Sequence, residues 1–168
     1  MQMAGRRTCI ASLLWASALL GGCGFELRGA TELPFSRIAL EGFAPRSPLA
    51  DELKRALSQS AATVTPPAQA QVVLHALSDK RERSVVASTT AAQVRDLQLR
   101  VRLEFKLTTP GGRELIPATE LLLTRDMSYS ETLALAKEYE ETQLLKAMQS
   151  DIVSQLMRRL AHVKGVAS

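Results

Sequence analysis

The stretch Gln98–Leu107, with the sequence QLRVRLEFKL, decides the fold. Apolar side chains occupy every second position from Leu99 onward and polar side chains fill the positions between them. This strict period of two predicts a strand with one buried face and one solvated, largely basic face. Pro110-Gly111-Gly112 then predicts a hairpin turn, and Ile116–Tyr129 returns as a second strand.

The preceding segment, Ala70–Ala87, is a further strand candidate in which Val72, Leu74 and Ala76 share one side. Three successive strands joined by short links favour antiparallel pairing. A shorter alternating segment, Ser36–Gly42, predicts one more strand, and Thr63–Gln71 is expected to be a connector.

Two helices accompany these strands. Ser47 is expected to cap the first, with Pro48 at its first position and an end near Ser60. Apolar residues spaced by three and four predict a long amphipathic helix from about Leu135 to Ala161. The order of elements therefore predicts an α+β fold, a four-stranded mixed or antiparallel sheet with two helices packed on one face, and its other face is left polar.

The N-terminus is typical of a targeting segment. Arg6 and Arg7 precede an apolar run, Cys9–Leu20, which is short for a membrane span but suits a signal peptide. Leu20-Gly21-Gly22-Cys23 resembles the lipobox of bacterial lipoproteins, in which cleavage precedes an acylated cysteine. The alternative is an ordinary signal peptide with a chance cysteine.

The resemblance to lipoproteins implies N-acyl and S-diacylglycerol groups on Cys23 and no other cofactor. Gly24 rather than Asp follows Cys23, which implies an outer-membrane lipoprotein on the periplasmic side. We expect four segments: a signal peptide (1–22), a lipidated tether (23–34), the α+β domain (35–162) and a short tail (163–168).

No catalytic or metal-binding constellation emerges from the sequence, so an enzyme, including a periplasmic hydrolase, is disfavoured. The histidines, His75 and His162, have structural explanations as a partly buried strand residue and a partner of the helix dipole. Removing Arg6 and Arg7 with the signal lowers the net charge from +4 to +2. This small charge and the scarcity of aromatic residues disfavour nucleic-acid binding.

Basic residues outnumber acidic ones between Lys80 and Lys106. We expect them on one sheet face and its hairpin, where they would attract phosphate-bearing ligands such as lipid A head groups. The alternative is a solvated face that keeps the protein soluble. The seven basic residues are Lys80, Arg81, Arg83, Arg95, Arg100, Arg102 and Lys106.

Three segments resemble one known family, the LPS-assembly lipoproteins LptE. They are Cys23–Gly29 (CGFELRG), Leu133–Glu138 (LALAKE) and Gln155–Leu160 (QLMRRL). The similarity spans Cys23 to about Leu160 and includes the order of strands and helices.

The resemblance implies a four-stranded sheet with two helices and a position as a plug inside the outer-membrane β-barrel LptD. It also implies assistance to barrel assembly, direct lipopolysaccharide binding and insertion of that lipid into the outer leaflet. Lys137 in the LALAKE segment is the implied lipopolysaccharide contact. A second basic position of the family falls near Ala87, where the match fails.

The remaining lipopolysaccharide-binding candidates are Arg81, Arg83, Arg95, Arg100 and Arg102. Clustered arginines could compete for the cations that bridge lipopolysaccharide phosphates. The competing hypothesis is a generic outer-membrane lipoprotein that scaffolds another envelope complex without handling lipid.

Overall fold

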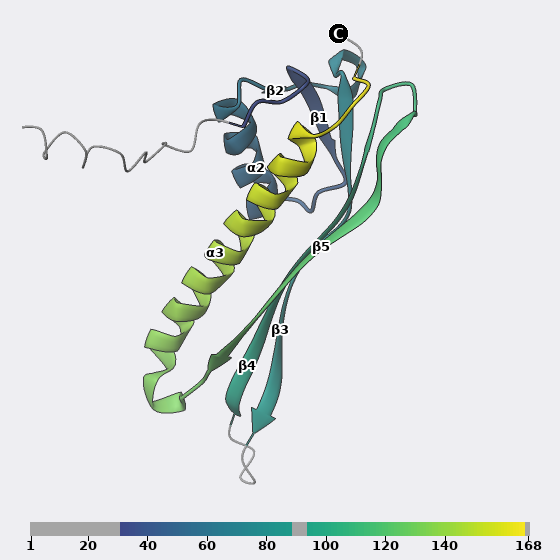
Figure 1. Cartoon of the computed structure of the whole chain (residues 1–168). Coiled ribbons are helices and arrows are strands. Elements are labelled where there is room, and N and C mark those ends of the chain that lie inside the picture. The colour runs from purple at the N-terminus through teal and green to yellow at the C-terminus, as the bar shows by residue number, and fades with distance from the viewer. Residues whose placement is uncertain (1–30, 89–93, 167–168) are drawn as a thin grey trace, which may run out of the picture.

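A computed structural model describes residues 31–88 and 94–166. Its strands and helices form an elongated body, with a long helix lying beside a long hairpin (Figure 1). In chain order the elements are β1 (Arg37–Glu41), α2 (Pro48–Gln59), β2 (Thr63–Val64), the 3-10 helix η2 (Pro67–Gln69), β3 (Val72–Ser88), β4 (Val94–Thr108), β5 (Glu114–Ser128), the 3-10 helix η3 (Glu131–Leu133) and α3 (Ala134–Ala161).

The strands form one mixed sheet in the order β2-β1-β3-β4-β5. β1 runs parallel to both of its neighbours, while β3, β4 and β5 are antiparallel, as predicted. The α+β fold is therefore confirmed. The short β2 adds a fifth strand within the expected connector, where Thr63 and Val64 pair with Arg37 and Ile38.

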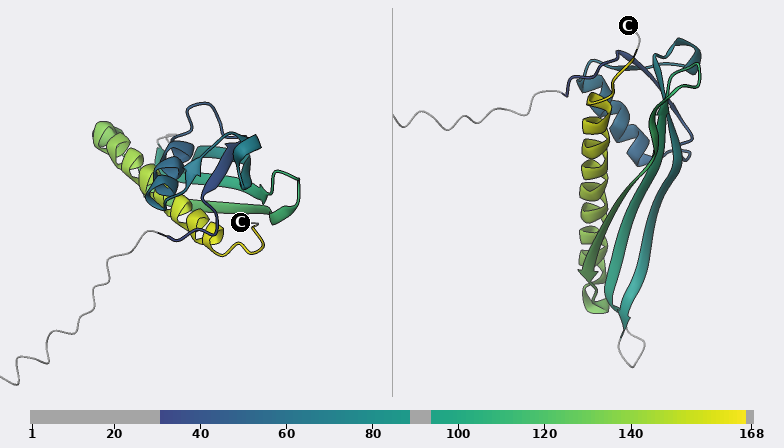
Figure 2. Two further views of the ribbon diagram at one scale, coloured as in Figure 1. Left: turned by 90° about the horizontal axis from the view of Figure 1, so that it is seen from above. Right: turned by 45° about the vertical axis from the view of Figure 1, so that its right-hand side comes forward.

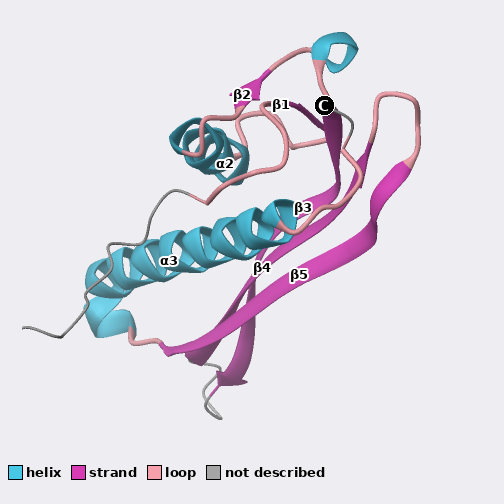
Figure 3. Ribbon diagram, turned by 45° about the horizontal axis from the view of Figure 1, so that its top comes forward, coloured by secondary structure: helices cyan, strands magenta, loops and turns pink. Residues whose placement is uncertain are grey.

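Both helices lie on one side of the sheet, which we call the helix-bearing face; the opposite side is the outer face (Figures 2 and 3). The odd-numbered residues of β4 from Leu97 to Leu107 are all buried on the helix-bearing face. Burying such a side chain contributes on the order of 1.5–3 kcal/mol. They share one core with Leu49 and Leu53 of α2 and with Ile152 of α3.

A β-bulge interrupts β3. Ala76 pairs with Phe105 and Ser78 pairs with Glu104, so Leu77 is an extra residue on β3. Because side chains alternate with a period of two, one extra residue moves the following side chains, as far as the next register shift after Val85, to the other face. Arg81, which pairs with the buried Val101, therefore lies on the helix-bearing face.

The two halves of α3 differ in burial. All of its buried residues lie from Met148 onward, where the sheet is widest and α2 packs beside it. The first half extends along the narrow β3–β5 end, and Leu144 and Leu145 are only partly buried there. The distal end of the body, comprising the start of α3 and the end of β5, therefore offers a more open surface.

Candidate functional site

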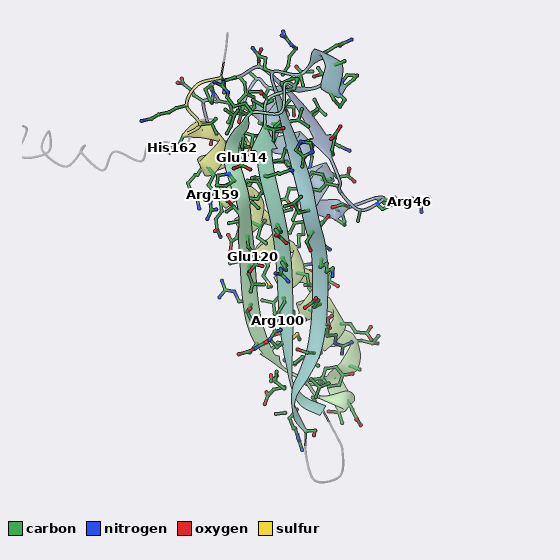
Figure 4. The ribbon with its side chains drawn as sticks, turned by 90° about the vertical axis from the view of Figure 1, so that its right-hand side faces the viewer. Arg46, Arg100, Glu114, Glu120, Arg159 and His162 are labelled. Atoms are coloured by element: carbon green, nitrogen blue, oxygen red, sulfur yellow. The ribbon has the colours of Figure 1, made fainter. Side chains whose placement is uncertain are left out.

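The outer face carries both signs of charge. In the strand register, Lys80 of β3 lies opposite Arg102 of β4, and Glu82 lies opposite Arg100. Arg102 forms an ion pair with Glu120 of β5. Figure 4 displays Arg100, Glu120 and Glu114 on this side of the sheet. The expectation of one basic sheet face is therefore wrong, because acidic residues of β3 and β5 interleave with the basic residues of β4.

Arg100 is exposed on this face, where its guanidinium donates hydrogen bonds to Gln98, with Nε 2.8 Å from Oε1. Gln98 in turn donates to Asp126 at 2.9 Å. Arg100 and Arg102 are thus each engaged by polar neighbours on their own sheet rather than gathered into a separate cationic site.

Arg81 and Arg83 lie on the opposite, helix-bearing face. Arg83 is paired with Leu99 in the strand register and its Nε is 3.4 Å from Oε2 of Glu141 on α3. Its guanidinium carbon also lies 5.8 Å from the centre of the Tyr129 ring, within the range of a cation–π contact. Arg83 therefore links the hairpin to α3.

Arg95 is exposed near the start of β4, where pairing with β3 is irregular. Its carbonyl oxygen accepts a hydrogen bond from the backbone N–H of Tyr129 at 2.6 Å. Ala87, the position where the family's second basic residue is missing, pairs with Asp96 at the same end. Arg95 and Arg83 are therefore both near Tyr129, and Arg81 is two residues from Arg83.

Lys137 lies in the first turns of α3, at the distal end. Its Nζ is 2.8 Å from Oε2 of Glu140 and 3.2 Å from Oγ of Ser128, at the end of β5. Its side chain is only 17% exposed. The ammonium is thus positioned by two elements, and a negatively charged ligand must compete with Glu140 for it.

Sequence reasoning missed an exposed apolar group close to Lys137 in the sequence. Leu133, Leu135 and Tyr139 are 58%, 83% and 68% exposed. The available signal was their spacing, because Leu135 and Tyr139 are four residues apart and off the buried stripe of α3. Leu135 and Tyr139 are each two residues from Lys137 on the helix, so they face solvent on the opposite side of α3 from Lys137, whose ammonium contacts Ser128 at the end of β5.

The predicted histidine positions agree with the structure. His75 is half-buried, with Nδ1 3.1 Å from Glu41 and Nε2 3.0 Å from Thr108. His162 caps the end of α3, and its Nδ1 is 2.7 Å from the carbonyl oxygen of Arg158. Cys23 and the targeting segment lie outside the described residues.

Within the two described ranges, no cluster of three or more histidine, cysteine or acidic residues is arranged to hold a metal ion. In the same ranges, no helix has the length and apolar content that crossing a bilayer requires.

Comparison with known proteins agrees with this architecture. The LPS-assembly lipoprotein LptE of Pectobacterium atrosepticum is 27% identical over 154 residues, covering 89% of this chain and 83% of that protein. The protein of the same name from Yersinia pestis is 28% identical over 160 residues, covering 92% and 76%.

A solved structure has a similar fold. The solution structure of an uncharacterized lipoprotein B from Nitrosomonas europaea has a TM-score of 0.69 and 28% identity, covering 82% of this chain and 90% of that one. The family model "LptE: Lipopolysaccharide-assembly" matches residues 35–160. The chain therefore belongs to the LptE family of lipopolysaccharide-assembly lipoproteins, which are not enzymes.

Proposed function

We propose that this chain is a lipid-anchored outer-membrane subunit that plugs the LptD barrel and assists its assembly. In this role it binds lipopolysaccharide and supports insertion of that lipid into the outer leaflet. The observation that carries the proposal is Lys137, which belongs to a segment resembling the family and whose ammonium is held at the distal end by Ser128 and Glu140.

The anchor would be Cys23, acylated on its sulfur and on the α-amino group that cleavage before this residue exposes. The eight residues from Gly24 to Thr31 can span at most about 28 Å. Two or three acyl chains hold a protein stably at a membrane. Such a tether would keep the domain close to the bilayer and raise its effective concentration near a membrane-embedded partner.

An elongated body with a polar exterior suits a barrel lumen, whose inner wall is polar. The outer face meets this requirement because acidic and basic side chains alternate on it, as in the Arg102–Glu120 pair. The exposed apolar residues Leu133, Leu135 and Tyr139 would contact a complementary surface of the partner or the lipid.

Lipopolysaccharide binding at Lys137 would involve an exchange of partners. A lipid phosphate must replace the carboxylate of Glu140, which is 48% exposed and free to move away. Phosphate carries more charge than a carboxylate and accepts several charge-assisted hydrogen bonds, so it would compete with Glu140 for the ammonium. Ser128 would remain as a second polar contact.

The barrel partner can be tested by photocrosslinking in cells. A crosslinking amino acid at Leu135 or Tyr139 should capture one large barrel protein, identified by mass spectrometry as LptD. Ala68, exposed in η2 near the opposite end of the body, is the control position. Capture of a different envelope protein at Leu135 would favour the generic scaffold instead.

Lipid binding needs a separate experiment. The Lys137→Ala variant of the lipidated protein should bind lipopolysaccharide several-fold more weakly than the wild type. Lys106→Ala, which removes one positive charge from the outer face, is the matched control. Equal binding by all three proteins would remove Lys137 from the proposal.

A further inference from the structure

We propose that a second lipopolysaccharide contact lies in a groove between α2, α3 and β3, where Arg55, Arg81 and Lys146 bind a phosphate carried on the sugar head group. This inference rests on the proposed lipopolysaccharide binding and assigns it a site separate from Lys137. We call it the interhelical groove, and its lining is Pro48, Asp51, Glu52, Arg55, Arg81, Thr142, Leu145, Lys146 and Gln149.

The groove follows from the packing of the two helices. Its α2 residues are spaced by three and four, as are its α3 residues, so each helix contributes one stripe. Arg81 closes the groove from the sheet, because the bulge at Leu77 places it on the helix-bearing face. The volume is about 430 Å³, within the range of sites for small ligands.

Three elements each contribute one cation to this groove. Arg55 comes from α2, Arg81 from β3 and Lys146 from α3. Within residues 31–88 and 94–166, the ion pairs of the structure do not include any of these three side chains. By contrast, Arg83, Arg102 and Lys137 each face a carboxylate.

The acidic residues of the lining are already engaged. Asp51 forms an ion pair with Lys54, at 3.4 Å between Nζ and Oδ1. Glu52 accepts hydrogen bonds from Gln149 on one oxygen and from Ser150 on the other. Gln149 is buried and also donates to the carbonyl oxygen of Pro48 at 2.9 Å. These contacts fix the floor of the groove and leave the three cations for a ligand.

The chemistry of the three cations selects the ligand. Arginine presents a planar set of donors that matches phosphate oxygens, and lysine adds a point charge. Leu145 supplies an apolar wall for the carbon skeleton that carries the phosphate. A phosphate ester on a sugar satisfies both features. The three cations alone would also bind free phosphate, so the experiment must distinguish a lipid head group from free phosphate.

The test compares two triple variants of the lipidated protein. Arg55→Ala, Arg81→Ala and Lys146→Ala together remove the three groove cations. Arg46→Ala, Lys80→Ala and Arg159→Ala remove the same charge at positions outside the groove lining, and Figure 4 displays Arg46 and Arg159 at opposite edges of the body. All six side chains are exposed, so both variants should retain the wild-type urea midpoint.

Binding is measured with lipopolysaccharide and with the same lipid after enzymatic removal of its phosphates. The groove variant should bind the phosphorylated lipid about tenfold or more weakly than the wild type, since charge-assisted hydrogen bonds are lost. The control triple variant should bind like the wild type. With the dephosphorylated lipid, the groove variant and the wild type should bind equally.

Other results would overturn the proposal. An equal loss in both triple variants would indicate a general charge effect, and a persistent difference with dephosphorylated lipid would exclude phosphate as the ligand group. Inorganic phosphate alone is the third probe. If it binds in the groove as strongly as the lipid does, free phosphate rather than the lipid is the ligand of the groove. If Lys137→Ala weakens lipopolysaccharide binding while the groove variant does not, only this inference fails. If the wild-type protein does not bind lipopolysaccharide at all, the proposed function itself fails.

Discussion

Arg83 of β3 and Glu141 of α3 form an ion pair that crosses from the hairpin to the less buried half of the long helix, with Nε 3.4 Å from Oε2. Glu141 is the more enclosed partner, with 19% of its side chain exposed against 51% for Arg83. Arg83 also contacts the face of Tyr129, at the point where the chain leaves β5. This group therefore connects three segments at the distal end, where apolar burial is small.

We predict that Arg83→Ala and Glu141→Ala loosen the first half of α3 without unfolding the domain. The coupling between the two substitutions should not exceed about 1 kcal/mol, because Arg83 is half exposed and water screens the pair. A double-mutant cycle in urea measures the coupling, and amide hydrogen exchange of residues 134–147 measures the local opening. Exchange that increases equally for residues 148–161 would contradict a local role.

A second prediction concerns the ammonium of Lys137. Glu140→Gln removes the carboxylate 2.8 Å away, so Lys137 no longer has to leave an ion pair to bind a lipid phosphate. Lipopolysaccharide binding by this variant should be about two- to fivefold stronger than by the wild type, corresponding to the loss of one partly exposed ion pair. Glu138→Gln, which removes the same charge in the same turn, is the control. If both variants bind equally tightly, only the net charge matters.

Much of the fold follows directly from local patterns. The alternation of Gln98–Leu107 predicted β4 and its buried face, because every second side chain must share a face in an extended strand. The cap at Ser47 and Pro48 predicted the start of α2 within one residue. These features depend on the chain close to each position, so a single sequence is enough to identify them.

The faces of β3 could not be obtained in this way. Continuing the alternation of Val72, Leu74 and Ala76 would put Arg81 on the outer face, but the extra residue Leu77 reverses the faces beyond it. A bulge depends on the partner strand, and the sequence around Leu77 contains no glycine or proline to mark it. The interhelical groove was therefore beyond sequence reasoning, although Arg81 itself was among the candidates.

The cap of α2 gives a third prediction. Ser47 is buried; its hydroxyl accepts a hydrogen bond from the N–H of Ala50 at 3.1 Å and donates one to Asp79 of β3. Ser47→Ala should lower the free energy of unfolding by about 1–2 kcal/mol, the usual value for a helix cap with an added contact. Ser58→Ala is the control, because its exposed hydroxyl donates a hydrogen bond to the carbonyl of Arg55 within the same helix. Equal urea midpoints for the two variants would show that the cap contributes little.

The last prediction concerns Gly42, which follows β1. Its φ is +76°, and a Cβ atom there would lie 2.2 Å from the carbonyl oxygen of Ala76, the residue before the bulge. Backbone must therefore move to accept any side chain, in addition to the cost of the left-handed conformation. Gly42→Ala should destabilise the domain by more than about 2 kcal/mol.

Gly112 in the turn between β4 and β5 provides a matched comparison. Its φ is +85°, but a Cβ atom there has no neighbour within 4 Å among the described residues. Gly112→Ala should therefore cost only the conformational strain, about 1 kcal/mol. Urea unfolding of both variants separates the two contributions, since the difference between them reports the contact with Ala76. Equal destabilisation by both substitutions would mean that the backbone at Ala76 moves without cost, and that the close approach of Gly42 to β3 does not contribute to stability.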